Sequence, residues 1–218
     1  MQLVMGLGNP GVEYAATRHN VGFMCVQALA ERLELSFDQV TGEYVAAVGA
    51  GPAGPVTLML PLTYMNRSGR ALQAWARRTG LTVAVPPPPD EGDEPSPPAE
   101  VTPLVVCDDI QLPLGSVRIR AKGSDGGQNG LASVIEAVGA NTVPRMRLGV
   151  GPLVGAVDPA EWADYVLTPF AENERPQVDD LIARSVEALV AVLTDGPELA
   201  GSRHNRRIRP EPDLPAED

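Results

Sequence analysis

The sequence predicts one α/β domain with three layers, in which helices cover both faces of a twisted central sheet that is mostly parallel or mixed. Three observations support this prediction. Short apolar runs alternate with segments whose apolar residues recur at helical spacing. The length of 218 residues suits one domain with a substantial core. Polar residues follow several predicted strands, at the edge where open α/β sheets bind their ligands.

The first half of the chain predicts three strands and two helices. A strand over Leu3–Gly6 leads into a glycine-rich loop, and a helix begins near Asn20 because apolar residues then recur at i, i+3 and i+4. The turn-forming GAGPAG separates predicted strands at Tyr44–Val48 and Val56–Leu60. A second helix is predicted from Asn66 to near Gly80.

The second half predicts three more strands and two helices. The strands are expected at Leu104–Cys107, Val117–Arg120 and Arg145–Val150. One helix carries Leu131, Val134, Ile135 and Val138 on a single face, and a long amphipathic helix is expected over Val178–Leu193. This alternation of strands and helices is typical of an α/β sheet covered on both sides.

Two acidic segments stand apart from the predicted domain, which spans residues 1–209. Residues 86–98 read PPPPDEGDEPSPP, a composition that favours a disordered or polyproline-like insertion over residues 86–100. Residues 210–218 are predicted to form an acidic disordered tail. The two segments carry nine acids and no base, and so account for all but two of the 11 net negative charges.

Basic residues gather elsewhere, so the overall charge does not exclude a nucleic-acid partner. Arg118, Arg120, Lys122, Arg145 and Arg147 outnumber the acids between residues 118 and 147. Four further arginines fall within seven residues, from Arg203 to Arg209. Local clusters of this kind, more than the overall charge, determine affinity for phosphate groups; a solvated basic surface is the alternative for the Arg203–Arg209 cluster.

Membrane and secretory features are not predicted. No window approaches the ~18 consecutive apolar residues of a membrane span, and the chain begins without a signal-peptide pattern. Cys25 and Cys107 fall in apolar patterns and are expected to be buried free thiols. A cytoplasmic location is therefore expected.

The stretch GLGNPGVEYAATRHNVG over residues 6–22 contains the first candidate catalytic residue, His19. Histidine is the side chain that ordinarily titrates near neutral pH, and Asn9, Tyr14, Arg18 and Asn20 surround it in sequence. Asn9, Asn66 and Asp108 each lie just past the carboxyl end of a predicted strand, so they are expected to converge.

Other chemistries fit the sequence less well. Pro10 interrupts the Gly6-x-Gly8-x-x-Gly11 dinucleotide pattern, and Glu31 lies in a helical pattern, so no cofactor is predicted. His19 has no neighbouring histidine to complete a metal site, and no G-x-S-x-G elbow is present. A thiol in an apolar strand stays protonated. Water activated by a histidine base, with a carboxylate to orient the ring, remains, and this equipment fits ester hydrolysis.

The asparagines have two compatible interpretations. Asn66 and Asn129 stand where helix N-caps belong, which is a common position for asparagine. A helix N-terminus is also an anion-binding site, so both residues are candidates for binding substrate.

Five segments, taken in order, resemble the bacterial-type peptidyl-tRNA hydrolase family. They are GLGNPGVEYAATRHNVGF (6–23), LPLTYMNRSG (60–69), VVCDDIQLPLGSVRIR (105–120), GGQNGL (126–131) and RMRLGVG (145–151). Gln128 stands where the family usually has histidine, and Ala132 where Lys or Arg often follows the NGL triplet.

The resemblance implies a monomeric enzyme that cleaves the ester between a peptide and the 3′ end of tRNA, without a cofactor or metal. It implies that His19 is the base, that Asp108 keeps it basic, and that Asn9 distinguishes blocked from free aminoacyl groups and helps to place the water. The substrate-contacting positions it implies are Tyr14, Tyr64, Asn66 and Asn129. Arg120 and Arg147 match a pair that clamps the terminal phosphate of tRNA, and the Arg203–Arg209 segment matches a basic C-terminal helix that can touch the acceptor stem.

Two other functions stay open at this point. One is a non-catalytic RNA-binding member of the same family, whose expected mark is the loss of a site residue. The other is a small-ester hydrolase that is indifferent to RNA, whose activity would respond little to salt.

Overall fold

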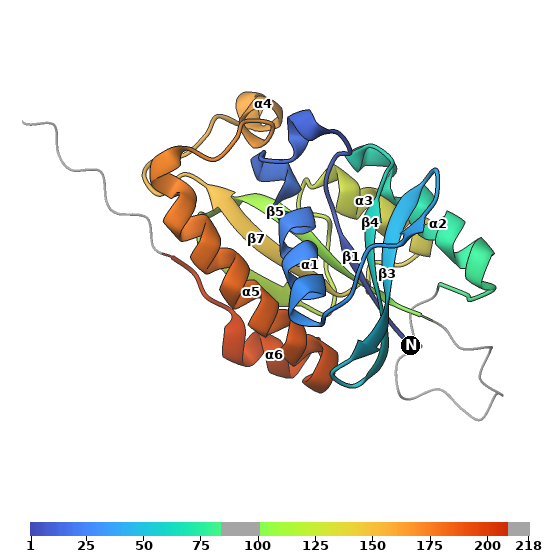
Figure 1. Cartoon of the computed structure of the whole chain (residues 1–218). Helices are drawn as coiled ribbons and strands as arrows, with labels where there is room; N and C mark the ends of the chain where they lie inside the picture. The colour runs from blue at the N-terminus through green and yellow to red at the C-terminus, as the bar shows by residue number, and fades with distance from the viewer. Residues whose placement is uncertain (84–100, 209–218) are drawn as a thin grey trace, which may run out of the picture.

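A computed structural model of the chain describes residues 1–83 and 101–208 (Figure 1). The predicted insertion at 86–100 lies outside the described residues, as do Arg209 and the predicted tail at 210–218. The described parts form a single α/β domain, which confirms the predicted class.

The sheet has seven strands in the order β2-β3-β4-β1-β5-β7-β6. Their bounds are β1 Gln2–Gly6, β2 Gln39–Val40, β3 Tyr44–Gly51, β4 Gly54–Pro61, β5 Pro103–Pro113, β6 Val117–Arg120 and β7 Arg145–Gly151. The four central strands β4, β1, β5 and β7 run parallel, whereas β3 pairs antiparallel with β4 and β6 pairs antiparallel with β7. The sheet is therefore mixed, with a parallel centre and antiparallel edges.

Helices cover both faces of this sheet, as predicted. The longer ones are α1 Val21–Arg32, α2 Ser68–Thr79, α3 Asn129–Val138 and α5 Arg175–Asp195, and shorter ones are α4 Trp162–Val166 and α6 Pro197–His204. Figure 1 shows α1 and α5 on the near side of the sheet and α3 behind it. The sequence patterns did not predict the short elements α4, α6 and β2, because helices of five and eight residues and a strand of two residues give too little periodicity.

Strand alternation divides the core into two clusters. Val4 of β1 packs with Val26 of α1 and Leu189 of α5 on one face. Its neighbours Leu3 and Met5 pack on the other face, in the cluster that holds Leu72 of α2 and Leu131 of α3. Because successive strand residues point to opposite faces, both faces of β1 are apolar and both need a helical cover.

Strand β5 is longer than predicted. Its pairing with β7 continues through Asp108 and Asp109, opposite Leu148 and Gly149, before the register shifts. Asp108 therefore lies inside the strand and not just past its end, which corrects the prediction. The physical reason is that β7 supplies backbone partners for charged residues, which a pattern of apolar residues alone does not reveal.

Residues 205–208, at the C-terminal end of the described chain, are extended and not helical. Helix α6 ends at His204, and Arg206 then exchanges two backbone hydrogen bonds with Val117 of β6. The Asn205 side chain accepts from the backbone N–H of Ile119 and donates to its carbonyl. These contacts cover the free edge of β6. Of the arginines in the expected basic C-terminal helix, Arg203 lies in α6, whereas Arg206 and Arg207 lie beyond its end, so a helix there is wrong for these two residues.

No helix in residues 1–83 and 101–208 combines the length and apolarity that crossing a membrane requires.

The approach of α1 to the sheet depends on Gly22. A Cβ at this position would lie 2.5 Å from the carbonyl oxygens of both Leu7 and Val106, which are backbone atoms. We expect Gly22→Ala to lower the free energy of unfolding by about 1–3 kcal/mol, as overpacked sites do. For a chain of this size, Tm should fall by roughly 3–10 °C in a thermal melt. Gly42→Ala is the control, because nothing lies within 4 Å of a Cβ there; equal Tm values for the two variants would contradict this account.

Candidate active site

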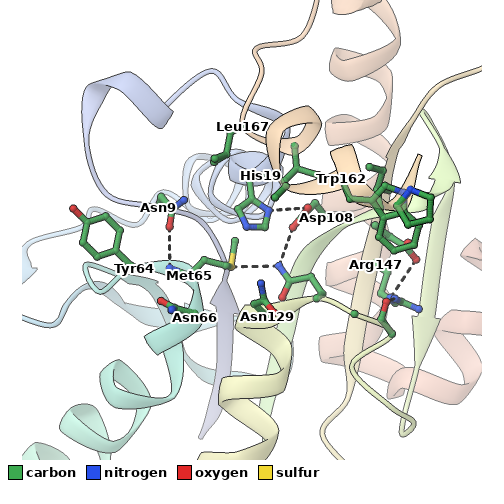
Figure 2. A pocket seen from close by; sticks show the side chains of 18 of the residues that line it. Asn9, His19, Tyr64, Met65, Asn66, Asp108, Asn129, Arg147, Trp162 and Leu167 are labelled. Atoms are coloured by element: carbon green, nitrogen blue, oxygen red, sulfur yellow. Dashed lines mark hydrogen bonds and ion pairs between the residues drawn. The ribbon is translucent and has the colours of Figure 1, made fainter. Parts of the chain in front are cut away.

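A cavity of about 670 Å³ lies over the carboxyl ends of the central strands. Seven of the nine predicted site residues line it: Asn9, His19, Tyr64, Asn66, Asp108, Asn129 and Arg147. Figure 2 shows Tyr64, Asn9 and Asn66 toward one end, Arg147 and Trp162 toward the other, and His19 with Asp108 between them. The cavity therefore has two distinct ends on either side of the histidine.

His19 and Asp108 form the central contact. His19 lies in a 3-10 turn, Arg18–Asn20, that leads directly into α1, and its Nδ1 is 2.8 Å from Oδ2 of Asp108. The Asp108 side chain is 4% exposed and the His19 side chain 14%, so the ring keeps some access to solvent. A contact between Nδ1 and a carboxylate favours the tautomer in which Nδ1 carries the proton and Nε2 is free.

The two adjacent carboxylates diverge because strand residues alternate. Asp108 lies on the same face of β5 as Val106, which is the face that α1 covers and where His19 lies. Asp109 lies on the opposite face, which it shares with Cys107, and its Oδ2 is 3.2 Å from Nε of Arg147. Asp108, not Asp109, is the partner of the histidine in this structure.

Asp108 has a second side-chain partner, Gln128. Its Nε2 donates to Oδ1 of Asp108 at 2.9 Å, while its Oε1 accepts from the backbone N–H of Leu131 at 2.7 Å. Gln128 is therefore the N-cap of α3. The expected cap at Asn129 is wrong, because Asn129 is already the first residue of the helix.

Asn66 also fails to cap its helix. It lies in a 3-10 turn, Met65–Arg67, and α2 begins at Ser68 with no side-chain cap. Neither the Asn66 nor the Asn129 side chain hydrogen-bonds to any other residue in the described part of the chain. Both side chains face the cavity, so their amides are available there.

Asn9 is held in one orientation. Its Oδ1 accepts from the backbone N–H of Met65 at 2.8 Å, and its backbone exchanges two hydrogen bonds with the Asn20 side chain. Because the amide oxygen is occupied, the amide NH₂ is the group that Asn9 offers to the cavity.

Arg147 is partly occupied by other groups. Its Nη2 lies 3.5 and 3.4 Å from the carbonyls of Asp125 and Gly126, and its Nε faces Asp109 without a well-aligned hydrogen bond. Burial raises the pKa of Asp109 above its usual value, although the Arg147 charge and a backbone hydrogen bond from Gln111 oppose this effect.

A second groove, of about 410 Å³, adjoins the first, and Asp109 and Arg147 line both. Four arginines line this groove without a carboxylate partner among the described residues: Arg118, Arg120, Arg206 and Arg207. Arg118 and Arg120 project from the same face of β6 and are exposed. The structure thus places Arg120 in the groove and not in the main cavity, and Tyr14 lines neither.

Arg203 and Arg145 are different from these arginines. Arg203 pairs with Asp195 at 2.6 Å, so it is the member of the C-terminal cluster with a counter-ion. Arg145 is 2% exposed and donates to the backbone carbonyls of Val143 and Ser124. Through these contacts Arg145 joins the segment just before β7 to the loop between β6 and α3.

Arg18, beside the histidine, is a buried clamp that the sequence patterns did not identify. Its two terminal nitrogens donate to Glu174 at 3.1 and 2.7 Å, and its guanidinium lies between the rings of Tyr165 and Phe170, 4.6 and 4.9 Å from their centroids. Its backbone N–H also donates to Thr168. The turn that carries His19 is thereby fixed to the segment that follows α4.

This clamp positions one wall of the cavity. Trp162, Ala163, Val166 and Leu167, in and beside α4, line the cavity. Figure 2 shows Trp162 and Leu167 on the side away from Asn66 and Asn129. No sequence pattern indicated these residues, because α4 is only five residues long. The sequence indicated Gln128 only as a departure from the family's usual histidine, and Met65 only as the neighbour of Asn66. Neither was predicted to line the cavity.

Both cysteines are buried free thiols, as predicted. Burial raises the pKa of Cys25 to about 12, against a hydrogen bond with Ser185. Burial and the charge of Asp108 raise the pKa of Cys107 strongly. Neither thiol is therefore a nucleophile at neutral pH. In the described ranges, no cluster of three or more His, Cys, Asp or Glu side chains could hold a metal.

Comparisons with known proteins agree on one family. A family model described as peptidyl-tRNA hydrolase matches residues 3–85 and 96–211. The peptidyl-tRNA hydrolase of Syntrophotalea carbinolica is 37% identical over 208 residues, covering 95% of this chain and 98% of its own. That of Elusimicrobium minutum is 40% identical over 209 residues, covering 94% of this chain and all of its own. The crystal structure of the Acinetobacter baumannii peptidyl-tRNA hydrolase superposes with a TM-score of 0.77 at 27% identity, covering 97% of each chain.

The Arg18–Glu174 pair should contribute to stability in a pH-dependent way. Burial alone would raise the pKa of Glu174, but hydrogen bonds from Arg18 and Ala171 together with the Arg18 charge lower it. A lowered pKa in the folded state means that the contribution is full above the usual glutamate range and disappears as pH falls through the lowered value. We expect Glu174→Gln to reduce the free energy of unfolding at pH 7 by about 1–3 kcal/mol.

Denaturant unfolding from pH 7 to about 3 measures this effect, since the difference from wild type should shrink in acid. Glu172→Gln is the control, because its side chain is 91% exposed and pairs with Arg175 at the surface. A loss for Glu174→Gln that stays constant with pH would show that the charge is not responsible.

Proposed function

The chain belongs to the peptidyl-tRNA hydrolase family, and from that premise we propose that it hydrolyses the ester between a peptide and tRNA with His19 as the general base. Its relatives are named for this activity, and the chain covers nearly their whole length. The observation that carries the proposal is the 2.8 Å contact between His19 Nδ1 and Asp108 Oδ2 at the centre of the cavity.

The base acts through Nε2. With Nδ1–H donating to Asp108, Nε2 keeps a lone pair that can take a proton from a water molecule in the cavity. Asp108 holds the ring in this tautomer and stabilises the imidazolium that forms during the attack. A base that acts on water needs no side-chain nucleophile, which agrees with the inert, buried thiols.

The reaction proceeds in two proton transfers. As water attacks the ester carbonyl carbon, its proton moves to Nε2 and the carbonyl oxygen becomes negative. When the tetrahedral intermediate collapses, the bond to the ribose oxygen of the tRNA breaks, and the imidazolium returns the proton to that oxygen. The products are a free carboxylic acid on the peptide and a free hydroxyl on the tRNA.

Asn9, Asn66, Asn129 and Tyr64 hold the peptide side of the substrate. The Asn9 amide oxygen is occupied by Met65, so Asn9 acts as a donor to a carbonyl oxygen. An N-blocked aminoacyl group presents such a carbonyl, whereas a free aminoacyl group presents a cation at the same place. A buried donor facing a cation is unfavourable, and this difference discriminates between the two.

The tRNA phosphates lie at the other end, in the basic groove. Arg118, Arg120, Arg206 and Arg207 form no ion pair with a carboxylate among the described residues, although Asp109 also lines the groove, and the groove meets the cavity at Arg147. Arg147 has fewer free donors than Arg120, so Arg120 and its neighbours contribute most of the phosphate binding and Arg147 contributes where the two cavities meet.

We predict that His19→Ala lowers kcat by roughly 10²–10⁴-fold while KM stays near its original value, because a general base acts in the transition state. The measurement is release of an N-acetylated amino acid from tRNA, with the same tRNA carrying a free amine as the control substrate. Retention of more than about a tenth of the wild-type kcat would exclude His19 as the base. A wild-type protein that binds this tRNA without releasing the amino acid would favour the non-catalytic alternative.

We predict that Arg120→Ala raises KM for tRNA substrates and flattens the dependence of log KM on log salt by about one unit of slope. A minimal ester without the tRNA phosphates should not distinguish Arg120→Ala from wild type. Arg147→Ala should raise KM and also lower Tm, because it leaves the buried Asp109 without its counter-ion. Arg32→Ala is the control, since Arg32 is exposed and only weakly paired; an equal effect of Arg32→Ala and Arg120→Ala would remove the groove from the binding site.

A further inference from the structure

Two hydrogen bonds fix the orientation of the Gln128 side-chain amide. Its Oε1 accepts from the Leu131 N–H at the start of α3, and its Nε2 donates to Asp108 Oδ1. The residue is 7% exposed, and Nε2 is also 3.3 Å from the sulfur of Met65. Rotating the amide by 180° would set an NH₂ against the Leu131 N–H and an oxygen against a carboxylate, so one orientation is fixed.

We propose that Gln128 is a positioning residue for the reaction, which holds Asp108 by Oδ1 so that Oδ2 is directed at His19. This inference rests on the proposed function, in which Asp108 orients the histidine. The carboxylate can rotate about its final torsion, and one hydrogen bond to His19 would not prevent this motion. A second bond from a side chain anchored to a helix N-terminus fixes both oxygens at once.

The anchor is also neutral. An amide donates to Asp108 without adding charge and does not ionise, so the bond persists at every pH at which the protein folds. The titratable and charged side chains that face this site from the surrounding elements are His19, Tyr64, Arg67, Cys107, Asp109 and Arg147. Gln128 therefore fixes the carboxylate while leaving His19 and Asp108 to set the charge of the pair.

The alternative is that Gln128 only caps α3. Gln128→Glu separates the two roles, because a carboxylate oxygen can still accept from the Leu131 N–H but its other oxygen faces Asp108 and cannot donate when ionised. If Gln128 positions Asp108, kcat for release of N-acetylated amino acid from tRNA should fall roughly ten- to a hundredfold with KM little changed, as for misplaced catalytic groups.

The pH–rate profile gives an independent measure. An added negative charge beside Asp108 favours the protonated imidazole, so the rising limb of kcat/KM should move to higher pH. Ser133→Ala is the matched control, since it removes a hydrogen bond between α3 and Gly69 without approaching Asp108. It should leave both kcat and the profile unchanged. A Ser133→Ala profile displaced like that of Gln128→Glu would overturn the proposal, because disturbing α3 would then be sufficient.

Gln128→Leu provides the test if Gln128→Glu does not fold. It removes the donor to Asp108 and the acceptor that caps α3 together, without adding charge. A positioning role predicts that kcat falls while the limb does not move to higher pH, and the double-mutant cycle with Asp108→Asn then separates this effect from loss of the cap. Thermal melts of each variant show whether the remaining protein is folded. A Gln128→Leu enzyme with the wild-type kcat would overturn the proposal.

A double-mutant cycle with Asp108→Asn shows whether the effect passes through Asp108. Gln128→Glu should cost at least fivefold less in the Asp108→Asn background than in wild type, because the carboxylate to be positioned is already gone. An equal loss in both backgrounds would overturn the positioning role and leave the proposed function intact. A wild-type kcat for Asp108→Asn itself would instead overturn the proposed function, and the inference with it.

Discussion

The alternation of side chains at the end of β5 is the constraint on which the site depends. Two adjacent carboxylates leave this strand on opposite faces, so Asp108 meets His19 beside α1 and Asp109 meets Arg147 beside the basic groove. A shift of one residue in the β5–β7 register would exchange them. The continuous backbone pairing of Asp108 with Leu148 and Asp109 with Gly149 therefore directs Asp108 to His19 and Asp109 to Arg147, where the main cavity meets the groove.

The histidine reaches Asp108 because two contacts fix its turn from both ends. Gly22 lets the first turn of α1 rest directly on the backbone of Leu7 and Val106. On the other side of the histidine, Arg18 is held by Glu174 and by two aromatic rings. The turn Arg18–Asn20 has little conformational freedom left, which is the condition for holding the His19 ring within 2.8 Å of the Asp108 carboxylate.

Local sequence patterns predicted the strands, the long helices and most of the residues around the cavity. Apolar patterns located β1, α1 and α5. Its ability to titrate near neutral pH made His19 a candidate, the position after an apolar strand made Asp108 one, and the resemblance to the family implied that the two act together. What the patterns missed depends on contacts between distant segments. Gln128 lies 20 residues from Asp108, and Arg18 lies 156 residues from Glu174. No local period encodes such pairs. The expected cap at Asn129 was wrong because the helix begins at Asn129, which places Gln128 at the cap position.

Contacts between distant segments also give the main cavity and the groove different environments. The chain has a net charge of −11, yet the arginines of β6 and of the C-terminal extension lie together, because Arg206 pairs with Val117 through the backbone. Exposed arginines that form no ion pair among the described residues suit a partner that carries phosphates, because neutralising phosphates releases the counter-ions condensed around them. Inside the cavity, Asp108 is buried, and each of its oxygens has a partner. Arg147 and Asp109 lie at the boundary between these two environments. A ligand that spans both therefore contacts an ion pair whose two opposite charges largely cancel.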